Sequence, residues 1–135
     1  MLFRSKPLFH QGERLAFACT VCHHTDVGGR VAGSNASDST EIYAEGLRIA
    51  PMKLYEAGKL NQTIMTFIDR NVRVPVKVFG DLRAQLAACH IAERQFADLV
   101  TRHGPAEVRE LMRETVDYAE RMTRDRKSTR LNSSH

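Results

Sequence analysis

The stretch GDLRAQLAACHIAERQFADLV, residues 80–100, carries the strongest structural signal in the sequence. Its apolar positions recur at spacings of three, four and seven residues, which places them on one face of a helix. Asp81 precedes the first of them and is a residue type that caps helix N-termini. The pattern predicts a helix over about residues 82–103, with an apolar face made of Leu82, Leu86, Cys89, Phe96 and Leu99.

A second helix is predicted directly downstream. Gly104 is suited to end the first helix and Pro105 to begin the next. Because the connection is so short, the two helices are expected to form an antiparallel pair. The apolar stripe of the second helix consists of Val108, Leu111, Met112, Thr115, Ala119 and Met122.

Upstream of the helices, residues 3–9 and 14–22 are rich in alternating apolar residues around a turn signal and predict a β-hairpin. Residues 23–45 show little periodicity and predict a long glycine-rich loop. A short extended segment broken by Pro51 is expected over residues 47–55, followed by a turn at 56–59.

Asn61 is expected to cap a helix over residues 62–71, with Ile64, Phe67 and Ile68 on one face. The fold class is therefore mixed α/β: a hairpin and a long loop followed by helices. The strands form too small a sheet to be stable alone, so the chain is expected to be part of a larger domain.

Composition narrows the possible functions. With 135 residues, 42% hydrophobic and 27% charged, the chain has the composition of one globular domain, and this excludes a multidomain enzyme within it. No apolar run approaches the roughly 18 residues of a membrane span, and no secretory signal is visible, so a cytoplasmic protein with reduced thiols is expected.

The last eleven residues, 125–135, are polar and break the apolar periodicity. They are similar to a translated sequencing adapter, so we expect a non-native tail and take residues 1–124 as the native domain fragment. The tail carries about half of the net charge of +4, and no aromatic residues are interleaved with its basic ones. Nucleic acid is therefore not an expected partner.

The candidate chemistry lies in CTVCHHTDVGG, residues 19–29. Haem attachment at Cys-x-x-Cys-His would require export, and a zinc ribbon would require a second cysteine pair. His23, His24 and Asp26 instead combine imidazole and carboxylate ligands that suit a catalytic divalent ion. Strand alternation sends the two histidines to opposite faces, so such a site would be incomplete, and a plain polar strand-to-loop junction is the alternative.

Other residues are candidates for contacting a substrate. Gly28 and Gly29 would allow a backbone to approach a substrate or phosphate closely, although no Gly-Lys-Ser/Thr nucleotide loop is present. Asp81 and Arg83 could reach a site from a helix start, or serve as a cap and a solvated face, respectively.

Five stretches carry a resemblance to a known family: GERLAFA (12–18), HHTDVGG (23–29), TEIYAEGLRI (40–49), KLYEAGKL (53–60) and GDLRAQ (80–85). In this order they resemble the hydantoinase B/oxoprolinase family, which includes N-methylhydantoinase B-type subunits and is related to the alpha-type subunits of acetone carboxylases. The resemblance covers nearly all of residues 7–124.

The resemblance implies a subunit of an ATP-dependent hydrolase that opens a hydantoin or 5-oxoproline ring, with a hydantoinase A-type partner that binds ATP and magnesium. It further implies a divalent metal, zinc, manganese or iron, with His23 as a ligand and His24 and Asp26 nearby. Family members are several-fold longer and carry a His-x-Pro-Asp element upstream. We therefore expect an internal fragment that is inactive alone.

Three other functions remain open at this stage. One is an acetone carboxylase-like subunit, and another is a non-catalytic helical interaction module built on the two C-terminal helices. The third is metal storage through Cys19, Cys22 and His23.

Overall fold

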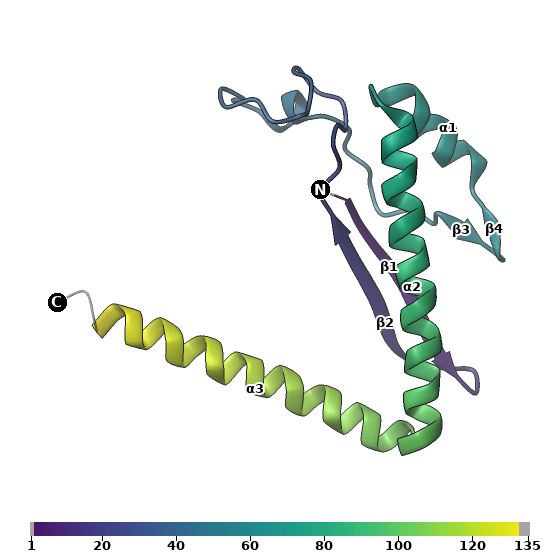
Figure 1. Ribbon diagram of the computed structural model, residues 1–135, viewed down its shortest axis with the longest axis vertical. Helices are drawn as coiled ribbons and strands as arrows, with labels where there is room; N and C mark the ends of the chain where they lie inside the picture. The colour runs from purple at the N-terminus through teal and green to yellow at the C-terminus, as the bar shows by residue number, and fades with distance from the viewer. Residues whose placement is uncertain (1, 133–135) are drawn as a thin grey trace. The chain divides into compact units, whose positions relative to one another are not determined.

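The computed structural model describes residues 2–132, and the side chains of residues 4–126. It contains two hairpins, one 3-10 turn and three α-helices (Figure 1), so the mixed α/β fold class is confirmed. The described residues form two compact units. One contains residues 2–4 and 19–88 and carries the candidate site, and the other contains residues 5–18 and 89–132.

The N-terminal hairpin matches its prediction. Strands β1 (Leu2–His10) and β2 (Glu13–Cys22) pair in a two-stranded sheet. The two residues between them, Gln11 and Gly12, have φ angles of 48° and 83°. Positive φ at both positions is the geometry of the two-residue turns whose twist matches that of the flanking strands.

The predicted long loop follows β2 and contains only a short 3-10 turn, η1 (Ile42–Glu45). A small hairpin then pairs β3 (Tyr55–Glu56) with β4 (Lys59–Leu60), which confirms the predicted turn at residues 56–59. The extended segment expected over residues 47–55 forms a strand only at its end, and the rest is irregular. A lone strand without a partner has no ladder bonds to hold it.

Helix α1 (Gln62–Asn71) has the predicted bounds. The Asn61 side chain caps it, because its Oδ1 accepts hydrogen bonds from the backbone N–H groups of Thr63 and Ile64 at 3.1 and 3.3 Å. Ile64 and Ile68 are buried, whereas Phe67, predicted on the same face, is largely exposed.

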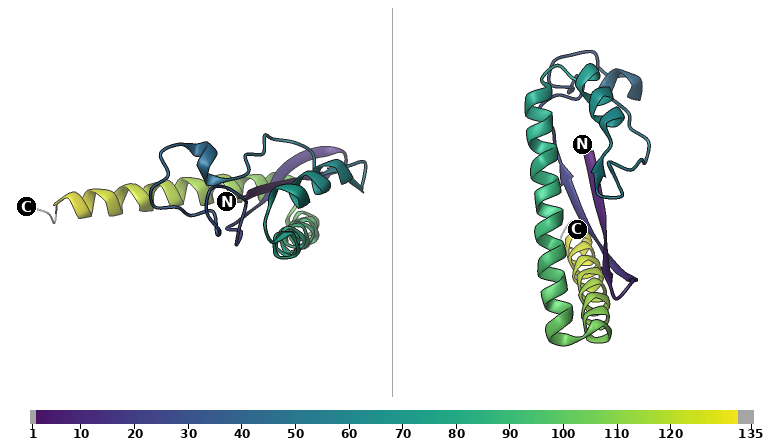
Figure 2. Two further views of the ribbon diagram at one scale, coloured as in Figure 1. Left: turned by 90° about the horizontal axis from the view of Figure 1, so that it is seen from above. Right: turned by 90° about the vertical axis from the view of Figure 1, so that its right-hand side faces the viewer.

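Helix α2 (Pro75–His103) is continuous and begins at Pro75 (Figure 2), so the predicted start near residue 82 and the N-cap role of Asp81 are both wrong. Proline is well suited to a first helical turn. Burial of Val78 stabilises the added turns, and a Cβ on Gly80 would meet nothing within 4 Å. The predicted end is confirmed, with Gly104 following at a φ of 82°.

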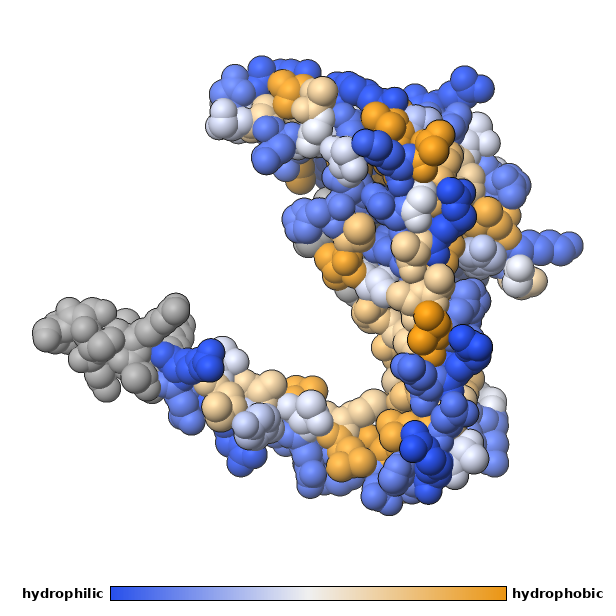
Figure 3. Space-filling model, in the orientation of Figure 1, coloured by the Kyte–Doolittle hydropathy of each residue, from blue (hydrophilic) through white to orange (hydrophobic). Residues whose placement is uncertain are grey.

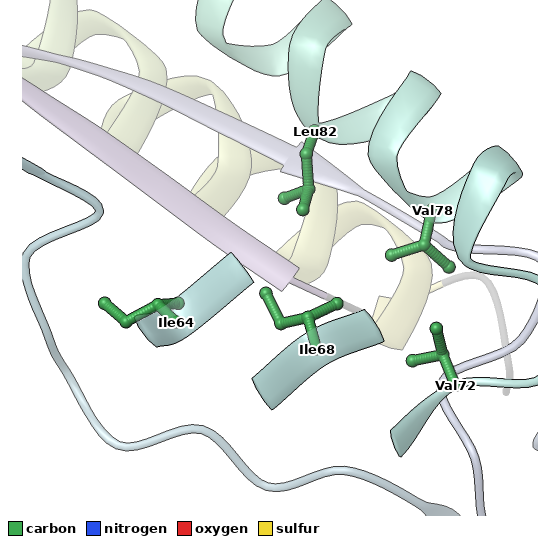
Figure 4. Close-up of a cluster of buried hydrophobic side chains, with 5 residues drawn as sticks. All are labelled: Ile64, Ile68, Val72, Val78 and Leu82. Atoms are coloured by element: carbon green, nitrogen blue, oxygen red, sulfur yellow. The ribbon is translucent and has the colours of Figure 1, made fainter. Parts of the chain in front are cut away.

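The unit that carries the site has an aliphatic core between α1 and the first turns of α2. Figure 4 shows its five side chains pointing toward one another, and Val78, Leu82 and Ile68 are at most 1% exposed. This core fixes the start of α2, on which part of the site depends. Its members are Ile64, Ile68, Val72, Val78 and Leu82.

The second unit has a smaller core of Leu8, Ala18 and Cys89, covered in part by Ala16, Ala92 and Phe96. These are mainly small side chains, which allow the hairpin and the helix backbone to approach closely. The Cys89 thiol is buried and lies 3.9 Å from the carbonyl oxygen of Ala18.

Helix α3 (Pro105–Asn132) confirms the second predicted helix but not its packing. Val108 is 1% exposed, yet the rest of the large apolar stripe is open to solvent, and Figure 3 shows apolar residues on the surface of α3. Antiparallel packing along α2 would have covered these side chains. They are Leu111, Met112 and Met122, and two large apolar residues outside the predicted stripe, Val116 and Tyr118, are exposed as well.

The predicted tail begins inside α3, whose backbone stays helical to Asn132, whereas residues 133–135 lie outside the described residues. Its non-native origin stays a prediction. None of the helices in the described part of the chain is long and apolar enough to cross a membrane.

Candidate functional site

The candidate site is built on the first residues of the loop after β2. His23, His24 and Asp26 follow the last strand residue, Cys22, as predicted. The strand alternation also holds, because His23 is exposed whereas the His24 side chain is 0% exposed. The two imidazoles therefore have different environments and different possible roles.

Asp26 organises the loop from within. It is 3% exposed, and its two carboxylate oxygens accept hydrogen bonds from the backbone N–H groups of Gly28 and Gly33, each at 2.8 Å. The Nη1 of Arg73, in the link between α1 and α2, donates to both oxygens at 3.3 and 3.1 Å. All of these donors come from the loop and from Arg73, and a metal-ligand role of Asp26 stays a prediction.

Arg73 also bonds to the loop backbone, and we call its pairing with Asp26 the Asp26–Arg73 lock. Its Nη1 donates to the carbonyl of Val31 at 3.0 Å, and its Nη2 donates to the carbonyl of Gly29. Burial alone would raise the pKa of Asp26, but the two backbone donors and the Arg73 guanidinium hold that pKa below its usual value. Asp26 is therefore ionised at neutral pH, and the lock joins opposite charges.

The glycines of the loop serve close contacts between backbones. Gly28 and Gly29 have φ angles of 88° and 87°, and a Cβ on Gly29 would lie 2.7 Å from the carbonyl oxygen of Ala44. A Cβ on Gly46 would lie 2.6 Å from the carbonyl oxygen of Val27. The close approach that was predicted toward a substrate is made to the chain itself, and a substrate role of Gly28 and Gly29 stays a prediction.

His24 faces α2. Its Nδ1 lies 3.2 Å from Oδ2 of Asp81, an ion-pair contact, and neither ring nitrogen makes a hydrogen bond of regular geometry among the described residues. Burial lowers the pKa of His24, the Asp81 charge opposes that shift, and the Arg4 charge adds to it. Asp81, predicted as a cap or a substrate contact, instead stands inside the helix as the carboxylate partner of a buried imidazole.

The remaining candidates do not converge into a closed metal centre. Within the described part of the chain, no three His, Cys, Asp or Glu side chains are placed to hold a metal ion. Cys19, Cys22 and His23 thus form no such group, and Arg83 is exposed on α2. Of the two predicted histidine ligands, only His23 has an exposed ring. His23 therefore fits a metal site to which it supplies one ligand and other residues supply the rest.

A hollow of about 380 Å³ opens beside the loop and includes Gly29 and Gly46 in its lining. Within it the Arg48 guanidinium lies 4.9 Å from the centre of the Tyr43 ring, a cation–π contact. The other lining residues are Leu47 and Asn71.

Sequence reasoning missed the two longest-range contacts of the site. Arg73 is 47 residues from Asp26, and nothing in its local sequence distinguishes it from a solvated arginine. The link between His24 and Asp81 was hidden because Asp81 has the residue type and position of a helix cap.

The comparisons with known proteins agree with this architecture. The chain is 39% identical over 119 residues to the beta subunit of the caprolactamase of Pseudomonas jessenii, and 33% identical over 120 residues to the B-type subunit of a putative D-/L-hydantoinase of a Pseudomonas species. Each alignment covers 88% of this chain and 20% of the relative, so the chain spans about a fifth of the length of these curated relatives.

The crystal structure of the ATP-dependent caprolactamase from Pseudomonas jessenii is also similar, with a TM-score of 0.80 and 38% identity over 90% of this chain and 21% of that one. A sequence profile described as hydantoinase B/oxoprolinase matches residues 3–130. The resemblance found in the sequence is thereby confirmed: the chain belongs to the hydantoinase B/oxoprolinase family.

Proposed function

We propose that this chain is a segment of the B-type subunit of an ATP-dependent cyclic-amide hydrolase, an enzyme that opens a hydantoin, 5-oxoproline or related lactam ring. The observation that carries the proposal is the exposed His23 imidazole at the end of a strand. Two residues that follow it are held: His24 contacts Asp81 of α2, and Asp26 pairs with Arg73. A side chain presented from a rigid scaffold is what a binding or reacting centre requires.

The reaction would divide between two subunits. A hydantoinase A-type partner would bind ATP and magnesium and transfer the terminal phosphoryl group to the oxygen of the amide carbonyl. Water would then add to the activated carbon, and the C–N bond would break with a proton passing to nitrogen, which leaves an acyl phosphate. A second water would attack this acyl phosphate, so that phosphate leaves and the carboxylic acid forms. One ring-opened acid, one ADP and one phosphate are formed per amide.

This chain would contribute one coordinating side chain to a divalent metal ion, which would be zinc, manganese or iron. His23 would supply that ligand, and other parts of the longer subunit would supply the rest, since the described residues contain no complete group. When bound, such an ion provides Lewis-acid polarisation of oxygen.

The test is hydrolysis by the full-length subunit reconstituted with its partner. ATP-dependent ring opening of hydantoin, 5-oxoproline or caprolactam is expected, and the His23→Ala variant should lose both metal and turnover. His103, an exposed histidine on α2, provides the matched control in His103→Ala. The 135-residue chain alone should be inactive. If no cyclic amide is consumed in the presence of ATP and metal, the proposal fails.

Two alternatives make different predictions in the same experiment. A carboxylase-type subunit would incorporate labelled bicarbonate into a substrate. The exposed apolar stripe of α3 favours a helical interaction module as the second alternative. For that module, His23→Ala would change nothing, whereas Tyr118→Ser would weaken association with the partner.

A further inference from the structure

His24, just after the end of β2, and Asp81, in the second turn of α2, form a polar link to which no function has yet been assigned. The His24 side chain is completely buried, and its Nδ1 lies 3.2 Å from Oδ2 of Asp81. Burying an imidazole is costly unless its N–H group finds an acceptor. The Asp81 carboxylate lies within ion-pair distance of Nδ1 and is positioned to serve as that acceptor.

Asp81 is itself fixed in place. It lies on α2 between Val78 and Leu82, which are 0% and 1% exposed and belong to the aliphatic core. These neighbours hold the backbone that carries Asp81, whereas its side chain is 35% exposed. The link therefore connects the loop to the helix turn that carries the aliphatic core of the unit.

The chain is also held two residues after His24, at Asp26, and two residues before it, at Cys22. Asp26 is locked by Arg73 and by two loop N–H groups, and Cys22 ends the strand. His23 thus lies in a short stretch restrained at both ends. Because neighbouring side chains of extended backbone point in opposite directions, an inward His24 requires an outward His23.

We propose that His24 and Asp81 are a positioning pair that aims the His23 imidazole outward at its metal. This inference rests on the proposed function, which assigns the ligand role to His23. The pair itself touches neither metal nor substrate. It acts by holding the backbone that carries the ligand, as outer hydrogen-bond partners do in metal sites.

The experiment measures metal binding by the full-length subunit purified with its partner. Manganese or zinc is titrated into the metal-free complex of wild type, Asp81→Ala, Asp81→Asn and His24→Asn. We expect roughly 10–100-fold weaker binding for Asp81→Ala and His24→Asn, and a smaller loss for Asp81→Asn, which keeps an acceptor oxygen. The control is Asp98→Asn, an exposed aspartate on the same helix, which should bind as the wild type does.

A second measurement separates positioning from folding and from the ligand assignment. Crystal structures of the metal-free wild type and Asp81→Ala are compared, with an ordered His23 ring expected only in the wild type. An ordered, outward His23 ring in Asp81→Ala would overturn the positioning pair, as would unchanged metal affinity in Asp81→Ala and His24→Asn. If the wild type binds no metal, the metal part of the proposed function fails, and the crystal structures alone decide on the pair.

Discussion

The loop after β2 and helix α3 are stabilised in opposite ways. The loop has little regular structure, yet two of its backbone N–H groups and the Arg73 guanidinium bond to one central acceptor, Asp26. Helix α3 is regular along its length, yet its large apolar side chains between Leu111 and Met122 are exposed. Regular secondary structure is thus a poor guide to which region the chain itself holds in place. The loop is specified by its own contacts, whereas the surface of α3 is suited to contact with further protein.

Removing the Asp26 carboxylate, the central acceptor of the loop, should cause the largest loss in the free energy of unfolding. Asp26→Ala leaves two backbone N–H groups without their acceptor and removes the carboxylate that pairs with Arg73. We expect a loss of about 3–5 kcal/mol in the free energy of unfolding, measured by urea denaturation of the chain. Glu120→Ala, which removes an exposed carboxylate paired with Arg124 on α3, is the control and should cost little. If Asp26→Ala and Glu120→Ala lost equal free energy of unfolding, the loop would not be held by its own contacts more strongly than the surface of α3.

Adding a methyl group at a tight glycine should be the next largest change. Gly29→Ala puts a Cβ 2.7 Å from a carbonyl oxygen at a φ of 87°, so strain and overlap combine. We expect a loss of about 2–3 kcal/mol in thermal or chemical unfolding. Gly12→Ala is the matched control, since its φ of 83° imposes similar strain with nothing within 4 Å. Should both variants unfold alike, close approach would not matter in the loop.

Acid should weaken the loop in a characteristic pH range. The pKa of Asp26 is lowered in the folded chain, so its stabilisation is complete above the unfolded-state pKa of about 4 and is lost as pH falls through the lower, folded-state value. This loss should be smaller than that of Asp26→Ala, because a protonated carboxyl still fills its position. Urea denaturation at a series of pH values from 6 downward should show a declining free energy of unfolding. The decline should be less steep in Asp26→Asn. An unchanged slope in that variant would assign the decline to other carboxyls.

The smallest effect should come from the surface of α3. Tyr118→Ser removes a side chain that is 58% exposed, and the free energy of unfolding of the chain should change by less than about 0.5 kcal/mol. Val108→Ala, at a position 1% exposed on the same helix, should cost about 1–2 kcal/mol. A large loss for Tyr118→Ser would show that its face is covered within the chain.

Local patterns predicted the elements whose causes are local. The Asn61 cap and the spacing of Ile64 and Ile68 gave α1 its bounds, and the turn at Gln11 and Gly12 gave the hairpin. The start of α2 was misplaced, because a glycine followed by an aspartate has the residues of a helix start. Burial of Val78, which no local pattern reveals, carries the helix past that point.

The site was predictable in composition but not in arrangement. The strand end, the glycines and the opposite directions of His23 and His24 follow from chain order and alternation. The partners of Asp26 and His24 come from Arg73 and Asp81, which are distant in sequence and are brought near by the core between α1 and α2. Contacts of that kind depend on tertiary packing, which single-chain periodicity does not encode.

The backbone bonds that close the loop also determine where its length can vary in evolution. Leu47 N–H donates to the Val27 carbonyl at 2.7 Å, and Arg30 N–H donates to the Ala44 carbonyl at 2.9 Å. Residues 31–43 therefore form a loop whose two ends are already joined by backbone hydrogen bonds. Inserting residues near 35–38 would add only loop-closure entropy, about 0.6 kcal/mol for each doubling of length. Relatives of different loop length can therefore keep the same strand end, and new surface for substrates or partners can be added there.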